Sequence, residues 1–274
     1  MISVLSGILA RIISNSYLNV FQKKLTNYGS KPSVINFYTY LGLTVFCSVL
    51  IPWITLSYSN ELVLNFIAMG ILGALGNYYI IKALSLGELS SLAPINSYKP
   101  IVALVVAFFY LHELPSVYAI LGILLIIAGT FILHNGGKYN KMAVFYRILA
   151  LIFSGSEAVF IKKIILLTNI PTSFALWAIS GLIFALCFAL LSKHKLKLPK
   201  MHNLGLLILS VAIMQYSTNF VFSKINVSYA LALFQLSTLL SVFLGVNIFH
   251  EKGLKRKIIA SLVMISGAVI IIFN

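Results

Sequence analysis

The sequence predicts an all-α polytopic membrane protein, in which ten transmembrane helices form two inverted five-helix repeats. Its composition, a series of apolar runs and an internal repetition support this prediction. Of the 274 residues, 60% are hydrophobic and 9% are charged, whereas soluble domains carry roughly 25% charged residues. The net charge of +15 would suit nucleic acid, but the basic residues lie in short loops between apolar runs, where membrane topology accounts for them. Nucleic-acid binding is therefore not expected.

Ten apolar runs are long enough to span a bilayer. A helix needs about 20 apolar residues to cross a hydrocarbon core of about 30 Å. The connections between the runs are short, so no separate soluble domain is expected. The first run lacks a preceding basic segment and a cleavage site, which favours a retained span over a signal peptide. The predicted spans are 3–25, 34–56, 62–84, 89–111, 116–134, 144–166, 173–192, 203–223, 228–249 and 256–273.

The two halves of the chain carry the same motifs in the same order. Leu111-His112-Glu113 matches Phe249-His250-Glu251 at an offset of 138 residues. Phe21-Gln22-Lys23-Lys24 matches Phe160-Ile161-Lys162-Lys163 at an offset of 139 residues. Because the matches keep their order and spacing, they predict a duplication, with repeats at 1–137 and 138–274.

A repeat of five spans ends on the opposite side of the membrane from where it began, so the second copy must be inverted. Loop charges agree, because equivalent loops differ in basic residues. The loop 57–61 has no Lys or Arg, and neither does 112–115. Their equivalents carry Lys193, Lys195, Lys197 and Lys200, and Lys252, Lys255, Arg256 and Lys257. Basic loops favour the cytoplasm, which predicts a cytoplasmic-membrane protein with both termini outside the cytoplasm.

These motifs resemble the drug/metabolite transporter superfamily, and specifically its EamA-type ten-helix members. Ala83-Leu84 precedes Pro100 by the spacing of that family, and an apolar run then closes at His112-Glu113, with His where Gly is usual. The second copy has Thr238 in place of the proline. The resemblance implies a central cavity lined by spans 1–4 and 6–9, with spans 5 and 10 outside. It also implies cytoplasmic termini, opposite to the side that the loop charges predict.

Several polar residues interrupt the apolar runs, and these are the candidates for substrate binding. A charged side chain at bilayer depth costs about 2.5–3.5 kcal/mol on insertion scales, so Lys99 in particular requires a polar cavity. The candidates are Arg11, Asn15, Asn77, Asn96, Tyr98, Lys99, Glu157, Gln215, Asn219 and Gln235. Interhelical hydrogen bonding is the alternative for the amides, and packing against a neighbouring helix is the alternative for Tyr98.

Charge suggests roles for three of these residues. Arg11 and Lys99 together would neutralise an anionic group of a substrate, although Arg11 could instead reach the nearer interface. Glu157 is the acidic residue well inside a span. It would exchange a proton or bind a substrate amine, and the alternative is a structural ion pair with Arg11.

The sequence therefore predicts a secondary active transporter, and the family resemblance implies that it is an exporter. It would move a small polar metabolite, zwitterionic or anionic, such as an amino acid, across the cytoplasmic (inner) membrane by alternating access. The expected partners are that substrate, the lipid bilayer and a coupling proton, with no cofactor and no metal, since His112-Glu113 lacks a second histidine. A lipid flippase and an intramembrane enzyme are the alternatives, and the oligomeric state is left open.

Overall fold

The computed structural model describes residues 2–56, 58–87, 92–133, 140–191, 196–237, 239–240 and 254–273. Within these residues the chain is helical and contains no strand. Three sequence features lie outside the described residues: the second His-Glu pair at His250-Glu251, Thr238 of the second motif, and the end of the span predicted at 228–249.

The described helices match nine of the predicted spans to within a few residues, and for the span predicted at 228–249 only the start is matched, by a short helix that ends at Phe234. Six of them are long and apolar enough to cross a membrane. These are α1 (Ile2–Asn27), α2 (Pro32–Phe46) with the 3-10 helix η1 (Cys47–Trp53), α3 (Asn60–Leu86), α7 (Lys141–Leu167), α8 (Ile170–Leu191) and α9 (Met201–Phe222). The shorter helices are η2 (Ala93–Tyr98), α5 (Lys99–Leu111), α6 (Val117–Leu133), α10 (Val227–Phe234) and α12 (Leu254–Ile272).

Helix ends follow local signals in the sequence. The side chain of Ser59 accepts a hydrogen bond from the backbone N–H of Leu62 at the start of α3, 3.1 Å away. Asn140 caps α7 in the same way, with bonds from Met142 and Ala143. Such caps satisfy backbone donors that have no partner within the helix. These two spans therefore begin where a capping residue precedes an apolar run.

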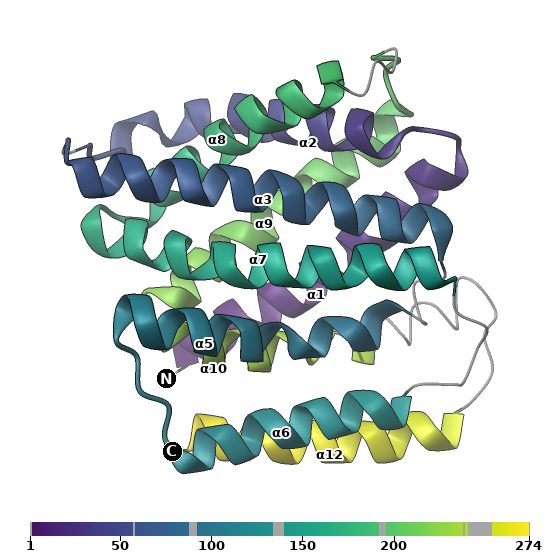
Figure 1. Cartoon of the computed structure of the whole chain (residues 1–274), viewed down its shortest axis with the longest axis vertical. Coiled ribbons are helices and arrows are strands. Elements are labelled where there is room, and N and C mark those ends of the chain that lie inside the picture. Colours follow the sequence, from purple (N-terminus) through teal and green to yellow (C-terminus); the bar gives the residue numbers. More distant parts are fainter. Residues whose placement is uncertain are drawn as a thin grey trace.

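Helices of the two halves pack against one another in antiparallel pairs (Figure 1). The most extensive contacts join α3 to α7, α6 to α12, and α1 to α9, and further contacts join α2 to α8 and α5 to α10. If each helix is replaced by its counterpart in the other half, the α3–α7 pair becomes the α9–α1 pair. Each of the other three pairs then maps onto itself. This is the pattern that a two-fold relation between the halves would produce.

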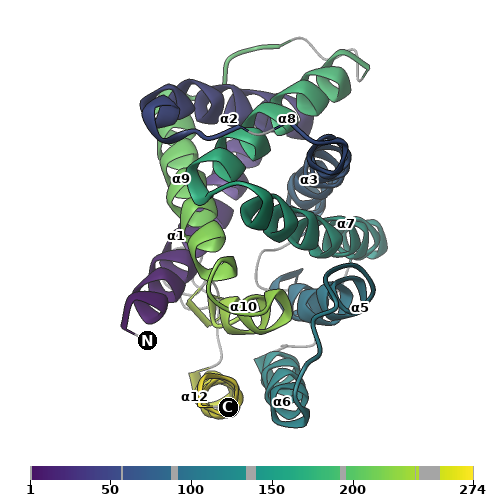
Figure 2. The ribbon, with the colours of Figure 1, turned by 90° about the vertical axis from the view of Figure 1, so that its left-hand side faces the viewer.

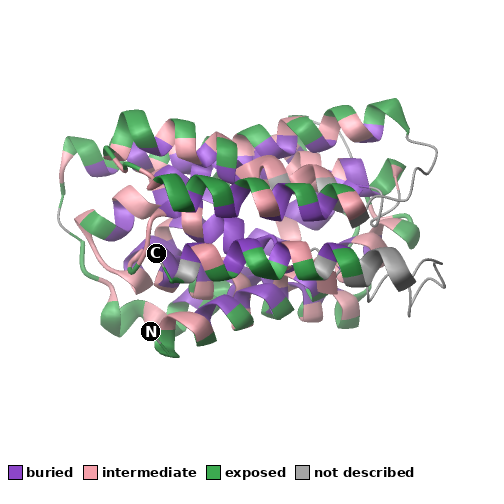
Figure 3. Ribbon diagram, turned by 90° about the horizontal axis from the view of Figure 1, so that it is seen from below, coloured by how far each residue is buried: buried purple, intermediate pink, exposed green. Residues whose placement is uncertain are grey.

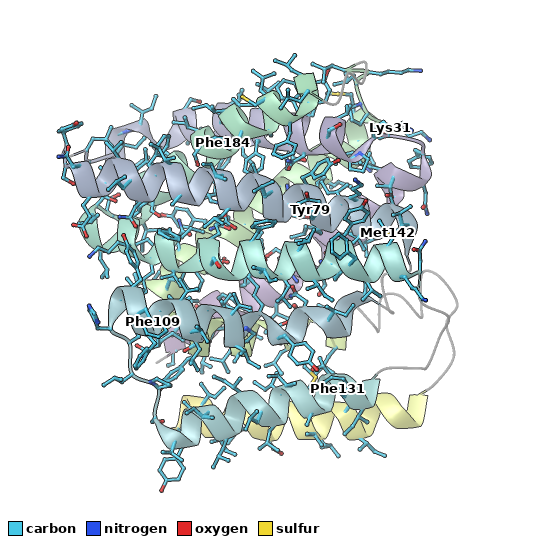
Figure 4. All side chains as sticks on the ribbon, in the orientation of Figure 1. Lys31, Tyr79, Phe109, Phe131, Met142 and Phe184 are labelled. Atoms are coloured by element: carbon cyan, nitrogen blue, oxygen red, sulfur yellow. The ribbon has the colours of Figure 1, made fainter. Side chains whose placement is uncertain are left out.

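Helix α7 approaches α3 closely at the glycines of α3. A side chain added at Gly73 would collide with the Glu157 carboxylate, and one added at Gly76 would lie 3.2 Å from Ser154. Tyr79, labelled between α3 and α7 in Figure 4, stacks on Tyr146 of α7 at a centroid distance of 5.7 Å. Small residues let membrane helices pack closely, so α3 holds α7, and Glu157 with it, in place.

Helices α6 and α12 lie at one edge of the bundle, as predicted for the two most aliphatic spans (Figure 2). They pack tightly, because a side chain added at Gly122 would meet the Gly267 carbonyl at 2.7 Å. The outer faces of the helices are exposed (Figure 3). Large apolar side chains lie there, and Leu64, Phe109 and Leu190 are each more than 60% exposed. Polar side chains lie inside instead, which suits a chain surrounded by lipid.

The fourth span is irregular where it meets the ninth. The fourth begins as the 3-10 helix η2 and becomes α-helical only at Lys99. In the ninth, α10 ends at Phe234 and a turn follows at Gln235 and Leu236. The amide of Asn96 donates a hydrogen bond to Gln235 Oε1 at 3.2 Å, which joins the two irregular segments. Non-helical backbone at membrane depth is tolerated where it lines a cavity.

Candidate functional site

A polar cavity lies in the middle of the bundle, between helices of both halves. It offers about 110 Å³ to the centres of water molecules, which is room for several waters or a compact solute. Its walls come from α1, α2, α3, η2, α5, α7, α8, α9 and α10. Of the predicted residues, Arg11, Asn15, Asn77, Asn96, Lys99, Glu157 and Gln215 line it.

Buried polar atoms without a hydrogen-bond partner concentrate at this cavity. Six such side-chain atoms occur among the described residues, and five belong to residues that line the cavity. They are Arg11 Nε and Nη1, Gln22 Oε1, Arg147 Nε and Ser154 Oγ; the sixth is Nδ2 of Asn36. Buried polar groups are almost always paired in proteins, so water or another polar guest is expected to pair these atoms.

Arg11 projects from α1 and is 9% exposed, which excludes the predicted alternative that it reaches the interface. Its guanidinium lies over the ring of Phe234, 5.0 Å from the centroid. A cation over an aromatic face is stabilised without using its N–H donors. The donors of Arg11 thus remain available to a guest.

Lys99 is the first residue of α5, where Pro100 follows in the first turn. Its ammonium interacts electrostatically with Glu157, Arg11 and Arg147. Lys99 makes no hydrogen bond and no ion pair with another described residue. The N-terminus of a helix also carries positive partial charge. Lys99 therefore adds a second unpaired cation to the wall of the cavity.

Glu157 lies on α7 and faces α8. The indole Nε1 of Trp177 donates a hydrogen bond of 2.5 Å to Glu157 Oε1. Glu157 is buried and forms no ion pair within the described residues, so the alternative of a structural pair with Arg11 is wrong. The indole holds one carboxylate oxygen in a fixed position.

Arg147 is a cavity residue that the sequence analysis missed. It lies on α7, is 6% exposed, and lines the cavity with Ser154 and Glu157 along one face of the helix. Arg147 lies near the predicted start of a span, where basic residues are common, so its charge did not mark it as a candidate. The aromatic side chains of Tyr40 and Trp177 also line the cavity and were missed, since aromatic residues in apolar runs usually pack in the interior.

The predicted amides form two groups. Asn15 donates a hydrogen bond to Ser237 Oγ at 2.9 Å, and Asn77 bonds to Asn36 and accepts from Gln22. Asn219 and Gln235 do not line the cavity but bond to lining residues, since Gln215 Nε2 donates to Asn219 Oδ1 at 2.9 Å and Asn96 donates to Gln235. These two amides therefore orient the residues that face the guest.

Tyr98 does not line the cavity either. Its ring packs edge-on against Phe131 of α6, with 5.6 Å between centroids. Figure 4 labels Phe131 on the side of α6 that faces α5. The alternative of packing against a neighbouring helix is therefore confirmed for Tyr98.

In the described part of the chain, three cations and one carboxylate line the cavity, namely Arg11, Lys99, Arg147 and Glu157. With all four ionised, the formal charge is +2. No group of His, Cys, Asp and Glu that could hold a metal occurs in the described part of the chain. The chemistry available is thus binding and charge neutralisation, together with proton exchange at Glu157.

The Lys and Glu residues of the repeated motifs form ion pairs and hydrogen bonds between helices near the ends of the bundle. Lys162 pairs with Glu113 and donates to the Ile225 carbonyl at 2.9 Å, while Glu113 Oε2 accepts from Val227 N at 3.0 Å. Glu113 thus connects the end of the fourth span to α7 and to the start of α10. Lys23, the repeat equivalent of Lys162, donates to the carbonyls of Leu84 and Gly87.

The fold and cavity together define a polytopic helical membrane protein with a central polar site. The chain belongs to the EamA-like transporter family, which matches residues 1–134 and 141–273. A solved structure titled "Crystal structure of protein" has the same fold, with a TM-score of 0.73, 15% identity and 98% of each chain covered. No curated protein sequence matches the chain.

Proposed function

We propose that this chain is a secondary active transporter of a small polar metabolite, anionic or zwitterionic, such as an amino acid. The proposal rests on the central cavity, whose walls carry cations and unpaired donors deep within an apolar bundle. Charged residues inside a membrane protein mark pathways for solutes and ions. Export, the direction common in the family, is the direction we propose.

Alternating access between two inverted repeats is the proposed mechanism. In such transporters, discontinuous helices meet at a site near the middle of the membrane, between the repeats. The contact between η2 and the end of α10 through Asn96 and Gln235 supports this mechanism, as does the exchange of helix pairs between the halves. Glu157 is the proposed site of a coupling proton.

The loop charges support a cytoplasmic membrane location with both termini outside the cytoplasm. The two ends of the chain lie at the same end of the bundle (Figure 1), as an even number of spans requires. A reporter fused after residue 274 tests on which side of the membrane the C-terminus lies. A cytoplasmic signal would contradict the assignment of the termini to the outside.

A flippase would require an apolar groove that opens into the polar cavity. An apolar groove of about 200 Å³ runs between α1, α10 and α12, along Ile8, Tyr229 and Leu233. It shares no lining residue with the polar cavity. A lipid would then have no continuous path for its headgroup and its tail, so we favour a solute carrier.

Counterflow in proteoliposomes tests the function. Vesicles containing the purified protein and a panel of polar metabolites are expected to accumulate the labelled form of one of them. Lys99→Met removes a cavity charge and is expected to reduce this uptake at least tenfold, whereas Lys200→Met, at an exposed position, should leave it unchanged. Normal uptake by Lys99→Met would remove Lys99 from the site.

A further inference from the structure

The cavity holds more positive charge than its own carboxylate can neutralise. Among the lining residues that the structure describes, Arg11, Lys99 and Arg147 face one acidic residue, Glu157. Exposed clusters of charge are screened by water and salt, but the two arginines are 9% and 6% exposed. An uncompensated charge in such surroundings is costly. A guest that neutralised the cavity would therefore carry two negative charges.

The unpaired atoms identify the kind of anion. Arg11 Nε and Nη1 are buried without a partner, and so is Arg147 Nε. A guanidinium presents its N–H groups in a planar fork, which matches the spacing of oxygens in carboxylate and phosphate groups. Two forks and one ammonium thus favour oxyanions over halide ions.

The three cations come from three different helices that line the cavity. Arg11 lies on α1, Lys99 at the start of α5, and Arg147 on α7, and Lys99 interacts electrostatically with both arginines. On α7, Arg147 precedes Glu157 by ten residues, which is about 15 Å along a helix. Because the three cations belong to different helices, a guest in the cavity can meet positive charge on more than one side, as a molecule with two separate anionic groups requires.

We propose that the substrate is a compact organic dianion whose two charges lie on carboxylate or phosphate oxygens. Arg147 and Arg11 are then specificity-determining residues that bind it, with Lys99 between them. This inference rests on the proposed transport function, which it narrows from polar metabolites in general to dianions.

Thermal unfolding of the purified protein at constant ionic strength tests the proposal. The panel contains dicarboxylates of three to five carbons, glycerol phosphate, propionate as a monoanion, alanine as a zwitterion, and chloride as the background. At a hundredfold excess over its Kd, a dianion is expected to raise Tm by about 5 °C. A response to the dicarboxylates or to glycerol phosphate identifies which oxyanion the site takes.

Variants then locate the binding site. Arg147→Gln and Arg11→Gln are each expected to weaken dianion binding at least tenfold. Lys141→Gln removes an exposed cation from the same helix as Arg147 and should bind as the wild type does. Because Arg147 has no described partner, the ligand-free Arg147→Gln protein is expected to unfold at a Tm no lower than the wild type. Arg147→Lys keeps the charge and should bind with intermediate affinity.

Each outcome bears on the proposal. A rise in Tm with alanine and none with dianions would overturn the proposal of a dianionic substrate and would leave the transport function unaffected. Equal dianion binding by Arg147→Gln and wild type would remove Arg147 from the site and overturn the assignment. Dianion binding without counterflow in vesicles would support the inference and overturn transport. No shift with any dianion of the panel would overturn the inference.

Discussion

Trp177 and Glu157 join α8 to α7 inside the cavity, through a hydrogen bond of 2.5 Å from the indole Nε1 to Oε1 of the carboxylate. Trp177 also packs on Tyr40, with 5.1 Å between ring centroids. Glu157 is the acidic residue among those that line the cavity. A proton that entered the cavity would therefore find its carboxylate acceptor held in one place by an aromatic donor.

Replacing this carboxylate is expected to abolish a pH dependence of transport. Glutamine keeps the shape of Glu157 and can still accept from Trp177, but it does not titrate. Uptake by Glu157→Gln, measured from pH 5 to pH 8 in vesicles, should be flat where that of the wild type varies. Trp177→Phe removes the donor alone and should keep the pH dependence. A glutamine variant that still responds to pH would exclude the proton role.

The close approach of α3 and α7 predicts that an alanine at Gly73 is destabilising. Its methyl group would occupy the position of the Glu157 carboxylate. Overpacking of this kind costs about 1–3 kcal/mol, and uptake should fall because Glu157 is displaced. Gly205 of α9 is the matched control, since nothing lies within 4 Å of an added Cβ. Gly205→Ala should stabilise the helix by up to about 1 kcal/mol, and equal effects at both sites would contradict the packing account.

The Lys162–Glu113 ion pair is expected to contribute more to stability than the Lys163–Glu61 pair. The side chains of the first are 12% and 11% exposed, and those of the second 27% and 50%. Breaking a buried pair leaves an uncompensated charge and costs about 3 kcal/mol, while an exposed pair contributes less than about 1 kcal/mol. Thermal unfolding of Glu113→Gln and Glu61→Gln measures the difference. A larger loss for Glu61→Gln would refute this ranking.

His112 ends α5 in a left-handed conformation, with φ at +56°. This conformation costs residues other than glycine roughly 1–2 kcal/mol, which explains why glycine is usual here in the family that the chain resembles. His112→Gly is expected to raise the free energy of unfolding by about 0.5–1 kcal/mol, after the added flexibility of the unfolded chain is subtracted. His112→Ala keeps the strained backbone and serves as the control. Equal stability of the two variants would argue against a cost of backbone strain at position 112.

The spans and the helix-end motifs could be predicted from the sequence because each depends on a local pattern. An apolar run of fixed length predicts α3 or α8 without knowledge of its neighbours. Leu111-His112-Glu113 at the end of an apolar run matches the end of α5 at Leu111. The break in the fourth span was signalled by two prolines, whereas no proline marks the end of α10 at Phe234.

The cavity could be predicted only in part, because a helical pattern does not say which face meets which neighbour. Lys99 and Glu157 stood out through their charge alone. Arg147 did not, because a basic residue near a predicted interface is common. Tyr98 is adjacent to Lys99 in sequence, but successive residues on a helix point in different directions, and its ring packs on Phe131.

Access to the cavity from both sides of the membrane is the most direct test of the account. Ser154 lines the cavity with an unpaired buried hydroxyl, so Ser154→Cys is a close replacement, in a background without Cys47 and Cys187. A membrane-impermeant thiol reagent should label this cysteine from either side of the bilayer, at a ratio that changes when substrate is added. In a separate control protein that keeps Ser154 and the exposed Cys187 of α8 but lacks Cys47, labelling of Cys187 should not respond to substrate. Labelling of position 154 from one side only, with and without substrate, would contradict alternating access.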